Sequence, residues 1–586
     1  MSKRHVEHLL GVAFALLDDA EATFPADHSE FERDRKRLAS LVEHRGLAIF
    51  TIDFPAILKH FDKCLEEGTY FRGEEIPHSR KASRGCAVPR LFRGLYLRVF
   101  DFRGKLRSEP DVNAIFLLRQ LYAFAKKLRI DCKKGAVYET VQDFVSVEES
   151  LPWPDLNWQG CDLDTPDRPL SYRRDIDQSS PGHDSFVPCD LLDTLRRVFG
   201  VVSTSFGTFD PLEIVDGDYQ DLPKHGPGAV SDLRSGEYKY NFPAWSPQLE
   251  SVFPYDVFAH ANMYAWVDTL STPVTLDHFG RSKLVCVPKT QRGPRLIASE
   301  PLAHQWCQQV VWSFLERGVR RSPLNRVIHF RDQSHNQAAA LASSAMDDRM
   351  TLDLSAASDR VSLWLVERAF WANRSLLRAL HACRTPTLQQ NIDRKVPEYV
   401  ELKKFSTMGS ACTFPVESIL FACIAMTAVL YCNGVTRVTA KAIRKHSAGV
   451  LVFGDDIIVP KYAGFTLENL LTYLGFKVNQ AKTFRNGRFR ESCGMDAYDG
   501  NDVTPAYVIR VPESSKPETL VSSVECSNNF FTKGLWHAAE YIRSCIGHGS
   551  IRVKHVSSGA FGYCSYVGPD PVLKKSRWNP DLQRNE

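Results

Sequence analysis

The sequence has no closely spaced cysteine pairs, no long apolar run and little net charge. Its 15 cysteines are scattered without C-x-x-C spacing, which argues against a zinc knuckle or a secreted disulfide framework and favours free thiols in a reducing compartment. No uninterrupted apolar run approaches the roughly 18 residues that a membrane helix needs, so no membrane association is predicted. With 73 Lys and Arg against 69 Asp and Glu, any nucleic-acid-binding surface must be local.

The composition is that of a folded, globular chain. Hydrophobic residues make up 44% and charged residues 24% of 586 positions, which excludes a disordered or collagen-like chain, and the length suggests about four domain-sized units. Apolar spacing predicts helices over residues 1–70 and 112–130. The first is expected to be amphipathic rather than a signal peptide, because charged residues and histidines interrupt its apolar stretch. The proline-rich residues 149–190 predict a long surface excursion.

A basic window covers residues 79–107. It holds nine Lys and Arg residues and one acid, interleaved with Phe92, Tyr96, Phe100 and Phe102. Cations that bind phosphates beside aromatic faces that stack on bases are typical of a nucleic-acid channel. The equally weighted alternative is a solvated basic face whose aromatic residues belong to the core. In the first interpretation, the RNA-binding residues are Arg90, Arg93 and Arg98.

Two short segments carry the carboxylates that dominate the sequence, and the adjacent pair in the second makes no sense as core. In residues 350–355, polar and apolar residues alternate as on a half-buried strand, which places Asp353 at a strand end and predicts Ser355 as the cap of a following helix. In residues 450–460, two apolar runs flank Gly454-Asp455-Asp456, the pattern of a tight β-hairpin with the acids at its tip. Three carboxylates would meet if these segments converge.

Three convergent carboxylates suit Mg²⁺, a hard cation that takes oxygen ligands and keeps positions open for phosphates. Two such ions can stabilise both the attacking and the leaving oxygen of an in-line displacement at phosphorus. For an isolated Gly-Asp-Asp, an ordinary solvated turn is the better interpretation, and only the surrounding segments reverse that balance.

Six segments between about residues 280 and 510 form an ordered series. They read V-P-K-T-Q-R-G-P-R-L-I-A-S-E-P (287–301), T-L-D-L-S-A-A-S-D-R-V-S (351–362), F-S-T-M-G-S-A-C-T-F-P-V-E-S (405–418), F-G-D-D-I-I-V-P (453–460), G-F-K-V-N-Q-A-K-T-F (475–484) and F-R-E-S-C-G (489–494). Each is weak alone, but the order is specific. Together they resemble the RNA-dependent RNA polymerase that is the catalytic (beta) subunit of the replicase of single-stranded RNA bacteriophages (levivirus type).

This resemblance implies a nucleotidyl transfer in which an RNA 3′-OH attacks the α-phosphate of an incoming NTP and pyrophosphate leaves. Asp353, Asp455 and Asp456 would hold two Mg²⁺ ions, for which Mn²⁺ can substitute, and the carbonyl oxygen of Leu354 could add a ligand. Lys482 is expected to act as a general acid towards pyrophosphate. The alternative role for Lys482 is a surface lysine that binds phosphate only electrostatically.

Three cations are expected to grip the triphosphate. Prolines keep the segment extended, and an arginine can bind phosphate bidentately. A solvated basic loop is the alternative. The three residues are Lys289, Arg292 and Arg295.

The segment 405–418 is expected to bring a small-residue loop and a helix to the nucleotide. The loop contains Ser410, and Thr413 and Glu417 share one helical face. Many polymerases of this class carry Asn at the position of Glu417, and the phage family often has Asn-Gly in place of Ser410-Ala411. Recognition of the ribose 2′-OH is therefore left open among Asp359, Ser358 and Thr413.

The resemblance further implies a mixed α/β right-hand polymerase with an antiparallel palm sheet backed by helices. Residues 1–320 would form mainly fingers with an N-terminal extension, residues 321–489 the palm, and residues 490–586 the thumb and C-terminal tail. Its partners would be RNA template and product, NTPs, host translation elongation factors and a host ribosomal protein, in the cytoplasm of a bacterial host.

Three other classes compete with this interpretation. A reverse transcriptase typically has an aromatic-x-Asp-Asp turn, but the neighbouring segments favour the phage replicase. A non-catalytic RNA-binding or capsid-associated protein would explain the basic window and leave the separated acidic and cationic segments unexplained. A hydrolase with paired carboxylates gives the cations of 287–301 no role.

Overall fold

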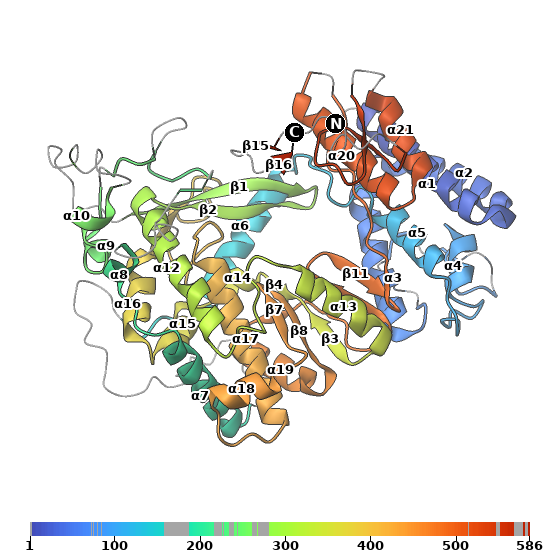
Figure 1. The fold of residues 1–586 in the computed structure, drawn as a ribbon. Coiled ribbons are helices and arrows are strands. Elements are labelled where there is room, and N and C mark those ends of the chain that lie inside the picture. Colours follow the sequence, from blue (N-terminus) through green and yellow to red (C-terminus); the bar gives the residue numbers. More distant parts are fainter. Residues whose placement is uncertain are drawn as a thin grey trace.

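The computed structural model has a mixed α/β fold (Figure 1), and the residues that it describes form three hydrophobic cores. It describes residues 3–156, 187–215, 225–260, 280–546 and 551–567, a few positions within these ranges excepted, together with 578–579 and 584–585. Most of the predicted excursion 149–190 lies outside the described residues. The cysteines that the structure describes are all free thiols, as the sequence predicts.

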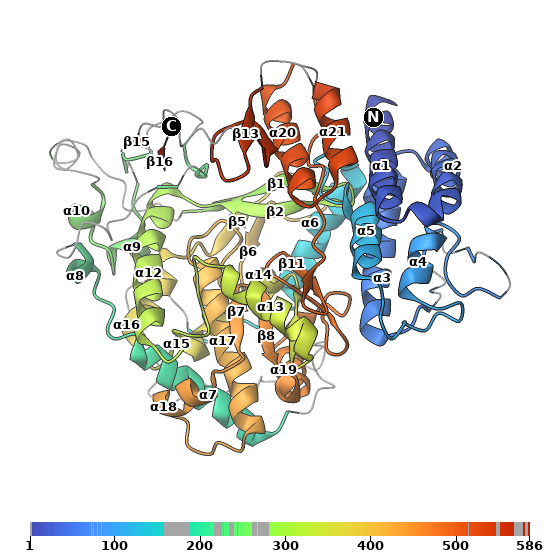
Figure 2. The same ribbon diagram turned by 45° about the vertical axis from the view of Figure 1, so that its right-hand side comes forward.

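The N-terminal and C-terminal helices share one core. Helix α1 packs against α21. Both views show these two helices, the first and the last described, side by side (Figures 1 and 2). The buried Arg119 of α5 pairs with Asp62 of α3 and, at 2.5 Å, with Asp496 of β11 (Met495–Tyr498). The helices of this body are α1 (Lys3–Thr23), α2 (His28–Arg45), α3 (Phe54–Glu67), α4 (Arg93–Val99), α5 (Val112–Ala123), α20 (Pro517–Thr532) and α21 (Trp536–Ile546), with η1 (Pro25–Asp27) and η2 (Ile49–Asp53) between them.

A long hairpin reaches from the centre of the molecule to this helical body (Figures 1 and 2). Its strands β1 (Ser282–Thr290) and β2 (Gly293–Ser299) are antiparallel, and β1 also pairs in parallel with β5 (Thr387–Gln389), which pairs with β6 (Tyr399–Glu401). Helix α6 (Lys134–Glu149) covers this mixed sheet through a small core of its own. At the hairpin tip, Arg292 donates a hydrogen bond to the carbonyl oxygen of Ile52 at 3.0 Å.

The central sheet has the order β3-β8-β7. Its strands are β3 (Arg349–Leu352), β7 (Leu451–Phe453) and β8 (Asp456–Pro460), and both neighbouring pairs are antiparallel. A parallel bridge between Ile328 and Val452 extends the edge, so the sheet with this extension is mixed. Two short strands, β4 (Leu354–Ser355) and β9 (Lys477–Val478), pair beside it.

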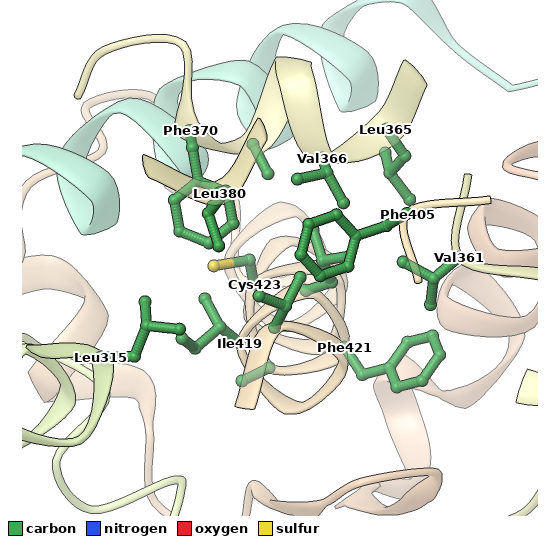
Figure 3. Close-up of a cluster of buried hydrophobic side chains, with 14 of the residues drawn as sticks. Leu315, Val361, Leu365, Val366, Phe370, Leu380, Phe405, Ile419, Phe421 and Cys423 are labelled. Carbon is green, nitrogen blue, oxygen red and sulfur yellow. The ribbon is translucent and has the colours of Figure 1, made fainter. Parts of the chain in front are cut away.

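Helix α17 (Thr413–Cys432) is the axis of the largest core. Figure 3 shows side chains from α12 (Leu302–Arg321), α15 (Leu363–Phe370) and α16 (Arg374–Cys383), together with Phe405, packed around it. A helix that is apolar all round must be buried on every side, and here 94% of its most apolar window is buried. Among the described helices it is the one long and apolar enough to cross a membrane, and its burial is that of a core helix.

The remaining helices and strands are distributed over the molecule. They are α7 (Cys189–Ser205), α8 (Pro211–Val215), α9 (Pro247–Glu250), α10 (Tyr255–Phe258), α12 (Leu302–Arg321), α13 (Ser334–Met346), α14 (Ala357–Arg360), α15 (Leu363–Phe370), α16 (Arg374–Cys383), α18 (Ala440–His446), α19 (Lys461–Tyr473), β10 (Phe489–Ser492), β11 (Met495–Tyr498), β12 (Asn501–Asp502), β13 (Val553–His555), β14 (Tyr563–Ser565), β15 (Trp578–Asn579) and β16 (Arg584–Asn585). Of these, β10 and β11 contribute Phe489 and Tyr498 to the core of the helical body.

One predicted helix cap is wrong. Ser355 lies in β4 and caps no helix, because the chain makes a second short strand before turning. The cap is Ser362, whose hydroxyl oxygen accepts a hydrogen bond from the backbone N–H of Leu365 at the start of α15. The predicted helices before residue 70 and near residues 112–130 are confirmed.

Candidate active site

The acidic pair lies where the sequence predicts it, on a two-residue β-hairpin. Phe453 of β7 pairs with Asp456 of β8, so Gly454 and Asp455 form the turn. Gly454 has φ +60°, the left-handed conformation that the first central residue of a type II′ turn requires and that glycine adopts without strain. Its N–H donates to the hydroxyl oxygen of Ser418 on α17 at 3.0 Å, which fixes the turn against the core helix.

The strand end that carries Asp353 lies beside this hairpin. The antiparallel register of β3 and β8 pairs Leu352 with Ile457, the neighbours in sequence of Asp353 and Asp456, and the charge of Asp353 acts on the pKa of Asp456. Opposed residues of antiparallel strands have Cα atoms about 4.5–5.5 Å apart. The register therefore brings the two acidic segments together, although 102 positions of sequence separate Asp353 from Asp455.

A cleft with a volume of about 370 Å³ opens at this point. It is lined by the hairpin tip, by the start of α17 and by the turn after β10. The lining residues are Gln333, Phe414, Glu417, Phe453, Gly454, Asp455, Asp456, Cys493 and Gly494.

The carboxylates carry mutually repelling charges. Burial, followed by repulsion from Asp455, raises the pKa of Asp456 to about 7. Burial also raises the pKa of Asp353, although Lys482 opposes the shift. Repulsion of this kind is relieved when a cation binds between the acids.

The donor set fits a hard divalent cation, because it consists of carboxylate oxygens beside an open cleft. Among the described residues, no three His, Cys, Asp or Glu side chains already form a metal-ligand cluster. Leu354, the predicted backbone ligand, is the first residue of β4 and pairs with Val478. Its side chain is buried.

Lys482 bridges two acids at the edge of the site. Its Nζ lies 3.5 Å from Asp353 Oδ1 and 3.3 Å from Glu491 Oε1. Burial lowers the pKa of Lys482, but Glu491 and Asp353 outweigh it and raise that pKa above its ordinary value. The lysine is therefore held as an ammonium ion next to the predicted metal ligands.

Two neighbours of this group were not predicted from the sequence. Asn479 donates a hydrogen bond from its side-chain amide to Asp353 Oδ2 at 2.6 Å, and its backbone N–H donates to the Asp353 carbonyl oxygen at 2.9 Å. Glu491 is the second partner of Lys482. They lie in the segments 475–484 and 489–494, so a polar residue three positions before the lysine and an acid within the short strand Phe489–Ser492 were the signals.

The predicted cations of the β1–β2 hairpin divide into two groups. The pKa of Lys289 is lowered by burial, then by Arg295 and Lys482, while Asp455 and Asp353 act in the opposite direction. Lys289 therefore lies within electrostatic reach of both acidic segments, and Arg295 lies near Lys289. Arg292, by contrast, contacts the backbone of Ile52 in the helical body.

The loop before α17 packs against β2. Gly409 has φ +136°, and a Cβ atom there would lie 1.9 Å from the Ala298 carbonyl oxygen. Close approach of two backbones thus requires this glycine in the structure. Ser410 accepts a hydrogen bond from the N–H of Cys412 at 3.3 Å.

The two helix residues predicted to face the nucleotide, Thr413 and Glu417, lie in different surroundings. The hydroxyl of Thr413 donates to the Thr407 carbonyl oxygen at 2.7 Å and contacts Ser406 Oγ at 2.8 Å, so it is already engaged. Burial, and then Asp455 and Asp359, raise the pKa of Glu417 far above its usual range. Glu417 therefore lies within electrostatic reach of both Asp455 and Asp359.

In the basic window, three of the four aromatic side chains are buried in the core of the helical body. Phe92, Tyr96 and Phe100 are fully buried, while Phe102 is exposed. This outcome is the one expected of a basic face whose aromatic residues belong to the core.

The three predicted RNA-binding arginines differ in their contacts. Arg98 forms an ion pair with Asp27 at 2.9 Å, and Arg93 lies 3.9 Å from Glu30. Arg90 is exposed. Both views place α4 at the outer edge of the helical body, with α3 and α5 on its inner side (Figures 1 and 2).

The mixed α/β fold and the cation-flanked acidic cleft define a candidate site for metal-dependent chemistry on phosphates. Residues 253–521 match the family described as RNA replicase, beta-chain. This match covers a little under half of the chain and confirms the resemblance predicted from the sequence. All the acidic and cationic site residues described above, outside the basic window, fall within these bounds.

Curated relatives align with about two fifths of the chain. The RNA-directed RNA polymerase subunit beta of Qbeta virus (strain MX1) is 35% identical over 231 residues, which are 39% of this chain and 35% of that protein. The subunit of Enterobacteria phage SP is 36% identical over 39% of this chain and 36% of its own length. The RNA-directed RNA polymerase beta chain of Escherichia phage MS2 is 34% identical over 38% and 36%. The chain thus spans about a third of the length of these relatives.

A solved structure, the in situ structure of BmCPV RNA-dependent RNA polymerase at elongation state, covers 75% of this chain and 39% of its own. The two share 10% sequence identity with a TM-score of 0.43, a similarity too low to assign fold or function.

Proposed function

We propose that the chain is the catalytic subunit of an RNA-directed RNA polymerase that replicates a single-stranded RNA phage genome. The observation that carries this proposal is the meeting of Asp353 with the Asp455-Asp456 hairpin beside Lys482, inside the region that matches the replicase family. The substrates would be an RNA template and NTPs. In this arrangement residues 321–489 form the palm, fingers come mainly from residues before 320, and the thumb from residues after 490.

The chemical step is a nucleotidyl transfer. The 3′-OH oxygen of the growing RNA attacks the α-phosphorus of the NTP, a new P–O bond forms, and the bond to the bridging oxygen of pyrophosphate breaks. Two Mg²⁺ ions, held by Asp353, Asp455 and Asp456, would neutralise charge on the attacking and leaving oxygens. The chain itself contributes positioning, through the hairpin, and fixed positive charge.

The cations would have different roles around the triphosphate. Lys289 lies within electrostatic reach of Asp455 and Asp353, and Arg295 lies near Lys289; both cations would bind the β- and γ-phosphates. Lys482, held as an ammonium by Glu491 and Asp353, would donate a proton to the departing pyrophosphate. Arg292 would act from a distance, because its guanidinium contacts the helical body.

The proposal extends to setting and partners. A phage replicase subunit would work in the cytoplasm of a bacterial host, with host translation elongation factors and a host ribosomal protein. Comparing the purified chain with and without host extract tests whether such partners are needed.

The decisive experiment is incorporation of labelled NTPs on a homopolymer RNA template. Asp455→Asn should lose at least about a thousandfold in incorporation, because it removes a carboxylate that would hold the Mg²⁺ ions at the reacting oxygens, and should still bind RNA. The matched control is Asp193→Asn, an exposed position on α7, which should behave as the wild type. A wild-type chain that bound RNA but incorporated no NTP with any metal or host extract would contradict the proposal and favour a binding protein.

A further inference from the structure

A buried lysine joins three segments behind the candidate active site. The side chain of Lys404 is 0% exposed, and its Nζ lies 3.0 Å from Asp359 Oδ1 and 3.2 Å from Glu148 Oε2. The same atom lies 3.6 Å from the ring centre of Phe144. We propose that Lys404 is a positioning residue that holds the Asp359 carboxylate towards the ribose of the incoming nucleotide, and that the chain thereby selects NTPs over dNTPs.

The backbone fixes Lys404 relative to Asp359. The N–H of Phe405 donates to the Val361 carbonyl oxygen at 2.8 Å, and the N–H of Leu363 donates to the Lys403 carbonyl oxygen at 2.9 Å. These bonds bind the segment of Lys404 to the chain that immediately follows Asp359. Glu148, at the end of α6, completes the support, because its Oε1 accepts the backbone N–H of Lys404 at 2.9 Å.

Of the three residues that the sequence left open for 2′-OH recognition, Asp359 fits best. The hydroxyl of Thr413 already donates to a backbone carbonyl oxygen, and Ser358 is buried. The side chain of Asp359 is 16% exposed. Its charge also reaches Glu417, whose pKa it helps to raise after burial and Asp455, so Asp359 lies on the side of the acidic cleft.

The charges explain how the group would select a ribose. A buried ammonium needs anionic partners, and Lys404 has two. It contacts one oxygen of Asp359, Oδ1, and an ionised carboxylate has a second oxygen that can only accept hydrogen bonds. A 2′-OH can donate to it, whereas a 2′-deoxy sugar leaves a partly buried carboxylate without that bond. Sites built to bind a substrate hydroxyl discriminate strongly against the analogue that lacks it.

This inference rests on the proposed function, and the test measures a ratio. The kcat/KM for CTP is divided by that for dCTP in the full-length chain with an RNA template. Because inactive protein lowers both constants equally, the ratio is insensitive to partial misfolding. Lys404→Met should lower the ratio at least about tenfold, and Asp359→Asn should lower it in the same direction. Lys404→Arg, which keeps the charge, should restore most of the preference.

The neighbouring lysine supplies the matched control. Lys403 donates to the Glu149 carbonyl oxygen at 3.1 Å and lies over the Trp153 ring, so Lys403→Met should leave the ratio unchanged. If Lys404→Met fails to fold with Glu148 left unpaired, the double variant Lys404→Met with Glu148→Gln removes both charges and carries the same expectation.

A third substrate identifies the hydrogen bond itself. The 2′-fluoro analogue of CTP cannot donate, so the wild type should treat it like dCTP, and Lys404→Met should treat all three substrates more alike. An unchanged CTP to dCTP ratio in a folded, active Lys404 variant would overturn the inference. A wild type without any incorporation would instead contradict the proposed function.

Discussion

The acidic centre and the basic window were both found as short patterns of charge, but they behave differently in the structure. Asp353 and the Asp455-Asp456 pair sit at a strand end and a hairpin tip, and the strand register brings them together. In the basic window, Phe92, Tyr96 and Phe100 point into the core, and Arg98 pairs with Asp27. A pattern tied to backbone topology predicts where side chains lie, whereas composition alone does not say which face they occupy.

The largest effect after loss of the acids is expected at Lys482. Replacing it with Met removes the ammonium beside Asp353, and kcat for NTP incorporation should fall by about a hundredfold or more, the usual contribution of a positioned general acid. The exposed Lys477→Met is the control on the same segment. A Lys482 variant with normal kcat would show that this lysine takes no part in the chemical step.

Glu491 should have a smaller effect, because it acts through Lys482. Glu491→Gln removes the 3.3 Å ion pair, so kcat should fall by about tenfold while KM for NTP changes less. Glu518→Gln, at an exposed position on α20, serves as the comparison. An equal rise in KM with unchanged kcat would assign Glu491 to substrate binding instead.

The basic window should show a weaker effect on RNA binding. Because Arg93 and Arg98 have acidic neighbours, the Ala variant of Arg90, Arg93 and Arg98 should change the slope of log affinity against log salt by no more than roughly one unit. If the slope changed by three units, the basic window would be an RNA channel after all, and its contrast with the acidic centre would disappear.

The smallest effect concerns the stability of the helical body at the basic window, where Asp34 contacts Phe92. Burial raises the pKa of Asp34 to about 7, while its oxygen accepts the N–H of Phe92 at 3.1 Å. The folded state therefore holds a proton on Asp34 that the unfolded state releases at lower pH. The stability that Asp34 contributes through this shift is fully present below the ordinary pKa of 3.8 and is lost as the pH rises to about 7. As the pH rises from 5 to 8, the free energy of unfolding of Asp34→Asn should increase relative to that of the wild type by a few kcal/mol at most. Denaturant unfolding measures this difference. A difference independent of pH would exclude the shift.

Much of the candidate site could be predicted because a turn glycine and the alternation of polar and apolar residues are local signals. Gly454 marks the turn, and the apolar runs around it mark the strands. Lys404 and Glu148 could not be predicted, because 256 positions separate them and each is an ordinary charge in its own segment. The cap at Ser355 failed for a related reason, since its pairing partner, Lys477, lies far along the chain.

The central claim is that Asp353 and the Asp455-Asp456 pair bind the same metal ions. With added hydrogen peroxide and ascorbate, Fe²⁺ substituted for Mg²⁺ reduces the peroxide to hydroxyl radicals that cleave the backbone near the bound ion, so the cleavage sites can be mapped directly. We predict cuts in both segments, near residues 353 and 455, that excess Mg²⁺ suppresses and Asp455→Asn abolishes together. Cleavage confined to one segment, or unaffected by Asp455→Asn, would contradict a shared metal site.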